Sequence, residues 1–173
     1  NLKPVAIATV ERNSVDVAKA VETINAASPE AVVQISAYTS CAAYIRAARK
    51  AGYGGGFYNV SFVGTQALAD ELGKFGAGVV VSQVVPSPYS GGKAISREFA
   101  DAVRRSNGAV QSNYSSMEGY IAAKVLAEGL RRSGGKGGAD GLMTALESIN
   151  NMSMGGFNVN FSKADHVAST FAE

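Results

Sequence analysis

The chain has 173 residues, of which 46% are hydrophobic and 17% charged, with 16 Lys and Arg against 14 Asp and Glu. The apolar fraction is that of a folded protein and one cysteine cannot form an internal disulfide, which excludes a disordered tail and a disulfide scaffold. A net charge of +2 is too small for a nucleic-acid binder, which needs clustered cations against phosphates. No apolar run reaches the ~18 residues that span a bilayer.

The first half of the chain alternates apolar runs of strand length with stretches that have the apolar periodicity of helices. The runs typical of strands buried on both faces of a parallel sheet are residues 5–10, 31–36, 57–60 and 78–85. Helices are predicted from a cap at Asn13 or Ser14 to Ser28, from Ser40 to Ala51, and from Thr65 to Leu72. This order predicts an α/β fold with right-handed crossovers and a Rossmann-like parallel sheet with helices on both faces.

Beyond Val85 the pattern changes, because a loop rich in Pro, Ser and Gly is followed by helical stretches with no strand between them. The longest predicted helix begins with a capping box at Ser115 and Glu118. Its predicted apolar face consists of Tyr120, Ala123, Ala127 and Leu130. Residues 157–161 then alternate apolar and Asn side chains as a half-exposed strand. Three helices and one strand do not make a complete layered domain, so the chain is predicted to be a piece of something larger.

The residues that could perform catalysis or bind a metal lack the partners that such chemistry needs. His166 is the one histidine, and only Asp165 stands beside it, so a polar turn residue is preferred over a metal ligand. Cys41 stands near a predicted helix start but has no His and Asn partners, which favours a small buried residue. The glycines at 52–56 follow a helix and precede a strand, the wrong order for a phosphate cradle. No catalytic residue, metal or cofactor is expected.

Ligands of open α/β sheets bind beyond the carboxyl ends of the strands. The loops that follow the strands ending near residues 36 and 60 provide hydroxyl groups and aromatic rings, which suit a small organic ligand. The candidate ligand-binding residues are Ser36, Ala37, Tyr38, Thr39, Ser61 and Phe62. Thr39 and its neighbour Ser40 are explained equally well as helix caps, so Tyr38 and Ser61 are the stronger candidates.

Six stretches of the chain together resemble a known family. They are Ser-Pro-Glu-Ala-Val-Val at 28–33, Ile-Arg-Ala-Ala-Arg-Lys-Ala-Gly-Tyr at 45–53, Val-Ser-Phe-Val-Gly at 60–64, Gly-Val-Val-Val-Ser-Gln-Val-Val-Pro at 78–86, Glu-Gly-Tyr-Ile-Ala-Ala-Lys-Val-Leu at 118–126 and Gly-Gly-Phe at 155–157. In this order they resemble the type I periplasmic solute-binding proteins of ABC importers, the Leu/Ile/Val-binding-like family. The similarity extends over nearly the whole chain.

The resemblance implies an incomplete version of a two-lobe architecture with three hinge crossings. Residues 1–85 would be most of the second, C-terminal α/β lobe, without its first strand and helix. Residues 86–92 would be a hinge crossing, 93–154 the helical part of the first lobe, and 155–173 a terminal strand returning toward the hinge. The residues implied for the hinge are Val85, Pro86, Ser87 and Pro88. The rest of the protein would have been removed, or a second chain would pair with this one to complete the fold.

The resemblance also implies a function. The chain would be the non-enzymatic, periplasmic substrate-binding component of an ABC importer, with a small-molecule ligand in an interlobe cleft and a membrane permease as partners. Amino-acid binders of the family place an acidic residue where this sequence has Ser61, so a branched-chain amino acid and a related carboxylate both stay open as ligands. The alternatives are a ligand-sensing receptor or regulator domain of the same fold and, with less support, a doubly wound enzyme.

Overall fold

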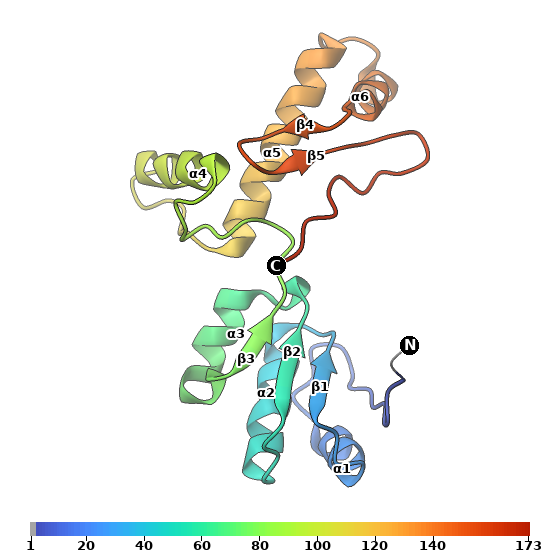
Figure 1. Cartoon of the computed structure of the whole chain (residues 1–173), viewed down its shortest axis with the longest axis vertical. Helices are drawn as coiled ribbons and strands as arrows, with labels where there is room; N and C mark the ends of the chain where they lie inside the picture. Colours follow the sequence, from blue (N-terminus) through green and yellow to red (C-terminus); the bar gives the residue numbers. More distant parts are fainter. Residues whose placement is uncertain (1–2) are drawn as a thin grey trace. The chain divides into compact units, whose positions relative to one another are not determined.

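The first half of the chain forms a three-stranded parallel sheet in the computed structural model, which describes residues 3–173. Its strands are, in spatial order, β1 (Ala31–Gln34), β2 (Gly56–Asn59) and β3 (Val79–Val81) (Figure 1). The other elements are the helices α1 (Ala18–Ala26), α2 (Tyr38–Lys50) and α3 (Thr65–Leu72) and the short 3-10 helices η1 (Ser61–Val63) and η2 (Gly73–Gly76). Parallel strands that alternate with helices confirm the predicted α/β class.

Helices α1, α2 and α3 all pack against one face of this sheet, the face formed by Val32, Phe57 and Val79. Because β1, β2 and β3 advance in one direction, right-handed crossovers place their connecting helices on the same side. On the opposite face a second row, Val33, Tyr58 and Val80, is 69%, 45% and 48% exposed. The prediction that residues 31–36 are buried on both faces is therefore wrong for this chain.

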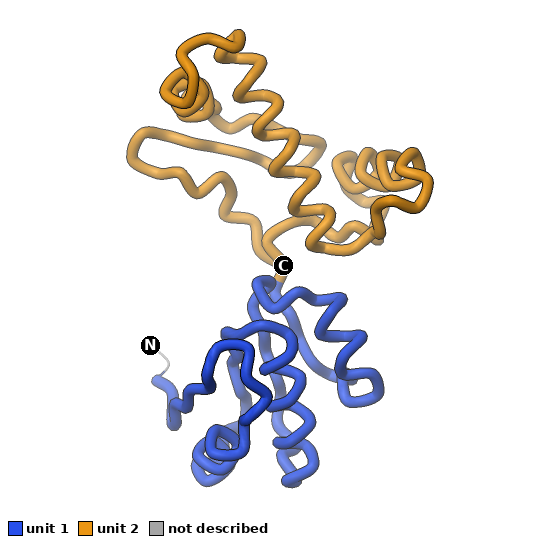
Figure 2. The backbone as a smooth tube through the Cα atoms, turned by 180° about the vertical axis from the view of Figure 1, so that it is seen from behind, with its two compact units in different colours: residues 1–82 blue, residues 83–173 orange. Residues whose placement is uncertain are grey.

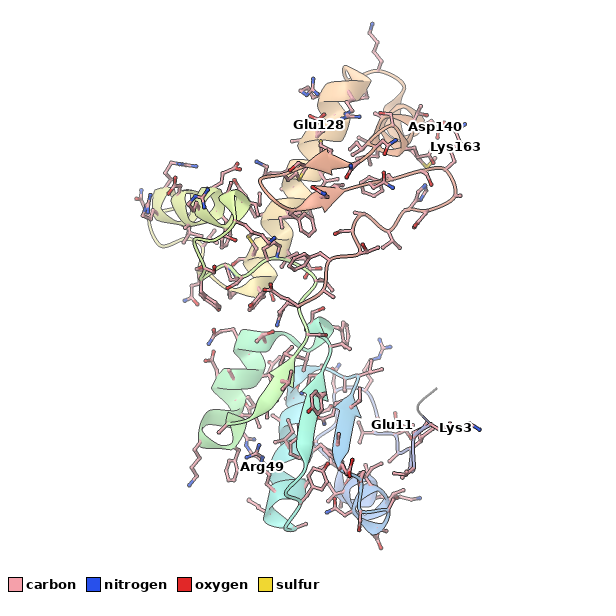
Figure 3. The ribbon with its side chains drawn as sticks, in the orientation of Figure 1. Lys3, Glu11, Arg49, Glu128, Asp140 and Lys163 are labelled. Carbon is pink, nitrogen blue, oxygen red and sulfur yellow. The ribbon has the colours of Figure 1, made fainter. Side chains whose placement is uncertain are left out.

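Phe57 is at the centre of the core between this sheet and its helices. Its ring is fully buried and meets the rings of Tyr53 and Tyr44 edge-on, with centroids 5.1 Å and 6.4 Å away. The guanidinium of Arg49 lies 5.5 Å from the centroid of the same ring. Arg49 also donates a hydrogen bond from Nη2 to the carbonyl of Ala77 at 2.6 Å, so α2 is tied to the chain just before β3 (Figure 3).

Several predicted boundaries in this half differ from the structure. Residues 5–10 form no strand, because they have no backbone hydrogen bond to a described residue. The run at 78–85 is a strand only over β3, and β1 ends two residues before residue 36. Helix α1 begins after Val17 without a side-chain cap, since the Ser14 hydroxyl instead accepts a hydrogen bond from the Asp16 amide at 3.0 Å. The prediction for α3 agrees with the structure at both ends.

The chain divides into two units between Ser82 and Gln83, close to the predicted change of pattern at Val85 (Figure 2). The second unit contains α4 (Ala94–Arg105), α5 (Tyr114–Ser133) and α6 (Gly138–Glu147), followed by the antiparallel hairpin β4 (Met152–Ser153) and β5 (Asn158–Val159). Gln83 and Glu173 exchange two backbone hydrogen bonds, which ties the two ends of this unit together. No described helix has the combined length and apolarity needed to cross a bilayer.

Helix α5 starts and packs differently from the prediction. Its cap is Asn113, whose Oδ1 accepts from the Ser116 amide at 2.9 Å while Ser116 Oγ accepts from the Asn113 amide at 3.0 Å. The capping box therefore lies two residues before the predicted one at Ser115. The buried residues of α5 are Met117, Ile121 and Gly129, whereas the predicted face is half-buried or exposed. The predicted alternation of residues 157–161 is confirmed, with the apolar side chains inward.

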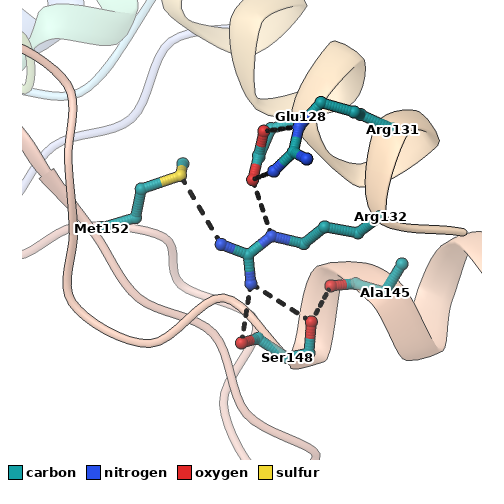
Figure 4. Close-up of polar contacts among 6 residues, drawn as sticks. All are labelled: Glu128, Arg131, Arg132, Ala145, Ser148 and Met152. Atoms are coloured by element: carbon teal, nitrogen blue, oxygen red, sulfur yellow. Dashed lines mark hydrogen bonds and ion pairs between the residues drawn. The ribbon is translucent and has the colours of Figure 1, made fainter.

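Charged groups join the carboxyl-terminal ends of α5 and α6 (Figure 4). The Glu128 carboxylate accepts hydrogen bonds from Arg131 Nε and Nη2 at 2.8 Å and 2.7 Å, and from Arg132 Nε at 2.7 Å. Arg132 Nη1 in turn donates to the carbonyl of Ser148 at 2.9 Å, just beyond the end of α6. Hydrogen bonding to Arg131, and then to Arg132, lowers the pKa of Glu128 to about 2.

This low pKa predicts an acid-dependent loss of stability in the second unit. A folded-state pKa below the unfolded value means that the carboxylate stabilises the fold above its ordinary pKa of 4.5, and that this contribution is lost as the pH falls to about 2. Thermal unfolding measured across this pH range should therefore show the native chain becoming less stable relative to the Glu128→Gln variant as the pH falls. Glu118→Gln, on the same helix and exposed, is the control. If the difference in thermal stability between the native chain and the Glu128→Gln variant does not change with pH, the assignment is contradicted.

Candidate functional site

The two predicted ligand loops leave the same edge of the parallel sheet. β1 and β2 are neighbours, and their last residues, Gln34 and Asn59, lie opposite each other in the register. The chain continues from β1 through Ser36 into the start of α2, and from β2 directly into η1. The six predicted residues therefore come from adjacent strand ends, the position at which open α/β sheets bind their ligands.

Within these loops the aromatic rings are the most accessible groups. Tyr38 is the first residue of α2 and is 41% exposed, and Phe62, in the middle of η1, is 73% exposed. Ser36, Ala37, Thr39 and Ser61 are half-buried. This arrangement offers two apolar ring surfaces with neutral hydroxyl groups beside them. Such an edge can contact an apolar ligand and form hydrogen bonds with it, but it has no acidic or basic group among the six residues.

Packed residues just behind each loop hold it in place. Ser40 is buried, and its hydroxyl donates a 2.7 Å hydrogen bond to the carbonyl of Ser14. In the second loop, Val63 is buried and Gly64 takes a left-handed conformation, φ 77°, that turns the chain from η1 into α3. The cap of α2 is Ala37, which makes no side-chain cap, so the alternative interpretation of Thr39 and Ser40 as caps is wrong.

Cys41 and His166 were considered above as possible catalytic or metal-binding residues, and neither lies in a site that has the partners for such chemistry among the described residues. Cys41 is buried, and this burial raises the pKa of its thiol to about 11, although a backbone hydrogen bond at Ser36 has a smaller lowering effect on that pKa. The interpretation of Cys41 as a small buried residue is confirmed. His166 is exposed, with Nε2 3.0 Å from Glu147 Oε1. Across residues 3–173, no group of three or more His, Cys, Asp and Glu side chains is placed to hold a metal ion.

Two amide side chains at this edge of the sheet were not among the predicted residues. Gln34 and Asn59 lie at the ends of β1 and β2, and Gln34 Oε1 and Asn59 Oδ1 are buried without a hydrogen-bond partner among the described residues. Asn59 Nδ2 is directed to the carbonyl of Val80, at 3.5 Å. The signal in the sequence is a polar residue at the end of an otherwise apolar strand. Both oxygens are acceptors that have capacity for one more donor.

The four predicted hinge residues lie at the beginning of the second unit, outside any helix or strand. Val85, Pro86 and Pro88 are buried, and Val85 belongs to the apolar core formed with Ile95 and Phe99. The strand predicted at 78–85 therefore ends before this segment.

A parallel α/β unit with neutral, aromatic-rich loops at the carboxyl ends of its strands has the architecture of a protein that binds small molecules. Comparison with protein families narrows this class to one family: residues 2–171 match the family model described as periplasmic binding protein. The chain belongs to the periplasmic binding protein family, and its fold is that of the type I, Leu/Ile/Val-binding-like members. No curated protein sequence matches the chain.

Solved structures of similar proteins support the same assignment. A possible leucine/isoleucine/valine-binding protein from Rhodopirellula baltica SH 1 is 30% identical, with a TM-score of 0.81 over 94% of this chain and 45% of that one. A substrate-binding periplasmic protein from Ralstonia solanacearum is 28% identical, with a TM-score of 0.84 over 94% of this chain and 47% of that one. An ABC transporter substrate-binding protein from Aeropyrum pernix, 20% identical with a TM-score of 0.73 over 87% of this chain and 41% of that one, shares the fold. The chain thus spans less than half the length of these proteins.

Proposed function

We propose that the chain is part of the substrate-binding component of an ABC importer, and that the edge formed by Ser36–Thr39 and Ser61–Phe62 is one wall of its solute site. The observation that carries this proposal is the pair of exposed rings, Tyr38 and Phe62, at the ends of two adjacent parallel strands. Exposed aromatic side chains on anchored loops are suited to covering the apolar part of a small solute.

The proposed solute is a branched-chain amino acid or a related carboxylate. The family match and the printed description of the Rhodopirellula baltica protein support this substrate class. Ser61 is neutral, and an ammonium group buried against it without a counter-charge would cost several kcal/mol. The wall therefore favours the solute without the ammonium, with the branched apolar end against Tyr38 and Phe62.

The other properties proposed follow from the family. The protein would act in the periplasm, deliver its solute to a membrane permease and catalyse no reaction, and Val85–Pro88 would act as a hinge crossing between lobes. These proposals rest on the match to periplasmic binding proteins and on the described likeness to an ABC transporter substrate-binding protein.

A pair of matched solutes tests both the site and the ligand class. Leucine and 4-methylpentanoate differ only in the ammonium group, and NMR titration of the chain can detect the weak binding expected of a site with one wall. We expect 4-methylpentanoate to bind more tightly, Tyr38→Ala to weaken it about tenfold, and Ser61→Asp to reverse the preference. Thr23→Ala, on the exposed side of α1, is the control. Unchanged binding of both solutes by Tyr38→Ala would contradict the site.

A further inference from the structure

The loop between α4 and α5 contains the one Asn-Gly pair of the sequence, Asn107 followed by Gly108 (Figure 1). Both residues are exposed, and both have left-handed backbone conformations, with φ +51° and +87°. A methyl group on Gly108 would have no neighbouring atom within 4 Å. Helix α4 ends two residues earlier, at Arg105, and α5 begins only at Tyr114. The pair therefore lies in a loop that no described residue covers.

The hydrogen bonds of this loop involve the residues on either side of the pair. The Ala109 amide donates to the Ser106 carbonyl at 3.1 Å, and the Val110 amide donates to Ser106 Oγ, also at 3.1 Å. The Gly108 amide and the Asn107 side chain, by contrast, form no hydrogen bond with a described residue. A backbone amide without an acceptor and an unbonded carboxamide are therefore neighbours along the chain.

These two groups are the reactants of an intramolecular acyl transfer. The Gly108 nitrogen loses its proton and attacks Cγ of Asn107, so that a new N–Cγ bond closes a five-membered succinimide. The Cγ–Nδ2 bond breaks, and the amino group leaves with that proton as ammonia. Water then opens the ring at either carbonyl and leaves aspartate or isoaspartate. Glycine favours the closure because no Cβ stands beside the attacking nitrogen, and both reacting groups belong to one chain.

Two other exposed asparagines with left-handed backbones provide a comparison within the same chain. Asn13 and Asn151 have φ values of 60° and 45°. Asn13 is followed by Ser14, whose amide donates a backbone hydrogen bond of 3.0 Å. Asn151 is followed by Met152, a half-buried residue of β4. The three asparagines share exposure and backbone conformation, but of the three, Asn107 alone precedes an amide without a neighbouring Cβ.

We propose that Asn107 is a deamidation site, at which attack by the Gly108 amide converts a neutral carboxamide into a carboxylate. The new negative charge stands just beyond the carboxyl end of α4, where the helix dipole disfavours it. The isoaspartate product also adds a methylene group to the main chain inside the turn that Ser106 closes. This site does not depend on the proposed solute, because it lies in the second unit and the candidate ligand residues lie in the first.

The test incubates the native chain at mildly alkaline pH and follows each asparagine by peptide mapping with mass spectrometry. We expect Asn107 to convert at least about tenfold faster than Asn13 or Asn151, and faster still as the pH is raised, because the attacking nitrogen must lose its proton. Amide hydrogen exchange at Ala109 and Val110 should be faster in the converted chain, since their hydrogen bonds to Ser106 span the altered link.

The Ser14→Gly variant separates the effect of the fold from that of the dipeptide. It creates a second Asn-Gly pair at an exposed, left-handed asparagine, but the amide at position 14 still has the Glu11 carbonyl as its acceptor. In the folded variant we expect Asn107 to convert at least about tenfold faster than Asn13, and in urea the two rates should agree.

Two results would overturn the proposal. One is a rate at Asn107 in the native chain that is more than about tenfold below its rate in urea, since the fold would then protect the pair. The other is equal conversion of Asn107, Asn13 and Asn151 in the native chain, which would show that the unbonded amide of Gly108 gives no advantage.

Discussion

Replacing Phe57 with alanine is expected to lower the free energy of unfolding of the first unit by about 3–5 kcal/mol. The ring has no exposed surface and lies where the sheet meets α2, so its removal leaves a cavity that rigid neighbours cannot close. The substitution also removes the edge-on contacts with Tyr44 and Tyr53 and the ring beneath Arg49. Urea unfolding followed by circular dichroism measures the loss.

Phe62→Ala is the matched control, because it makes the same chemical change at an exposed ring five residues along the chain. We expect it to change the unfolding free energy by less than about 0.5 kcal/mol. If Phe62 belongs to the solute site, the same variant will weaken solute binding while Phe57→Ala affects binding only through stability. Equal losses of stability for the two variants would contradict the assignment of Phe57 to the core.

The elements of the first unit that were predicted correctly are those whose signals are local. Helix α3 combines a short apolar period with Gly64 before it and Gly73 after it, and the prediction is right at both ends. Residues 5–10 have the β-branched composition of a strand, but a strand also requires a neighbour for its backbone groups. Among the described residues that neighbour is absent, and composition cannot reveal it. The same reason explains the exposed side chains of β1.

Helix starts were predicted less well because several residues near each start are equally good caps. Ser14, Ser40 and Ser115 are all residue types that cap helices. In the structure, Ser40 instead donates to the Ser14 carbonyl, and Ser14 accepts from the Asp16 amide. Which hydroxyl caps a helix depends on tertiary contacts that bring distant segments together. For α5, the cap is Asn113 rather than the predicted Ser115.

The position of the candidate site was predictable from the sequence, whereas its polar details were not. Parallel topology alone places the loops after β1 and β2 on one edge, because strand ends of the same sense meet there. The accessibility of Tyr38 and Phe62 depends on where α2 and η1 begin; the start of α2 was predicted to within two residues, and η1 was not predicted. A polar residue at each strand end marks Gln34 and Asn59 in the sequence, but whether their side-chain oxygens are left unpaired depends on packing beneath the edge.

Gly155→Ala is expected to destabilise the second unit by about 3 kcal/mol or more, because it combines backbone strain with a collision. Gly155 connects β4 to β5 with φ +65°, and its carbonyl accepts a 3.0 Å hydrogen bond from the Ile95 amide near the start of α4. A methyl group on Gly155 would lie 2.6 Å from the Ile95 nitrogen. The hairpin or the first turn of α4 would have to move, and Ile95 is fully buried.

The Gly134→Ala variant separates the cost of backbone strain from the cost of the collision in Gly155→Ala. Gly134 ends α5 with φ +60°, but a methyl group there would have no neighbouring atom within 4 Å. This variant should therefore show only the cost of the left-handed conformation, about 1 kcal/mol. The difference between the two variants in urea unfolding measures the close approach of the hairpin to α4. Equal losses would show that the hairpin moves away from Ile95 at no cost, so that the Gly155 contact does not hold the unit together.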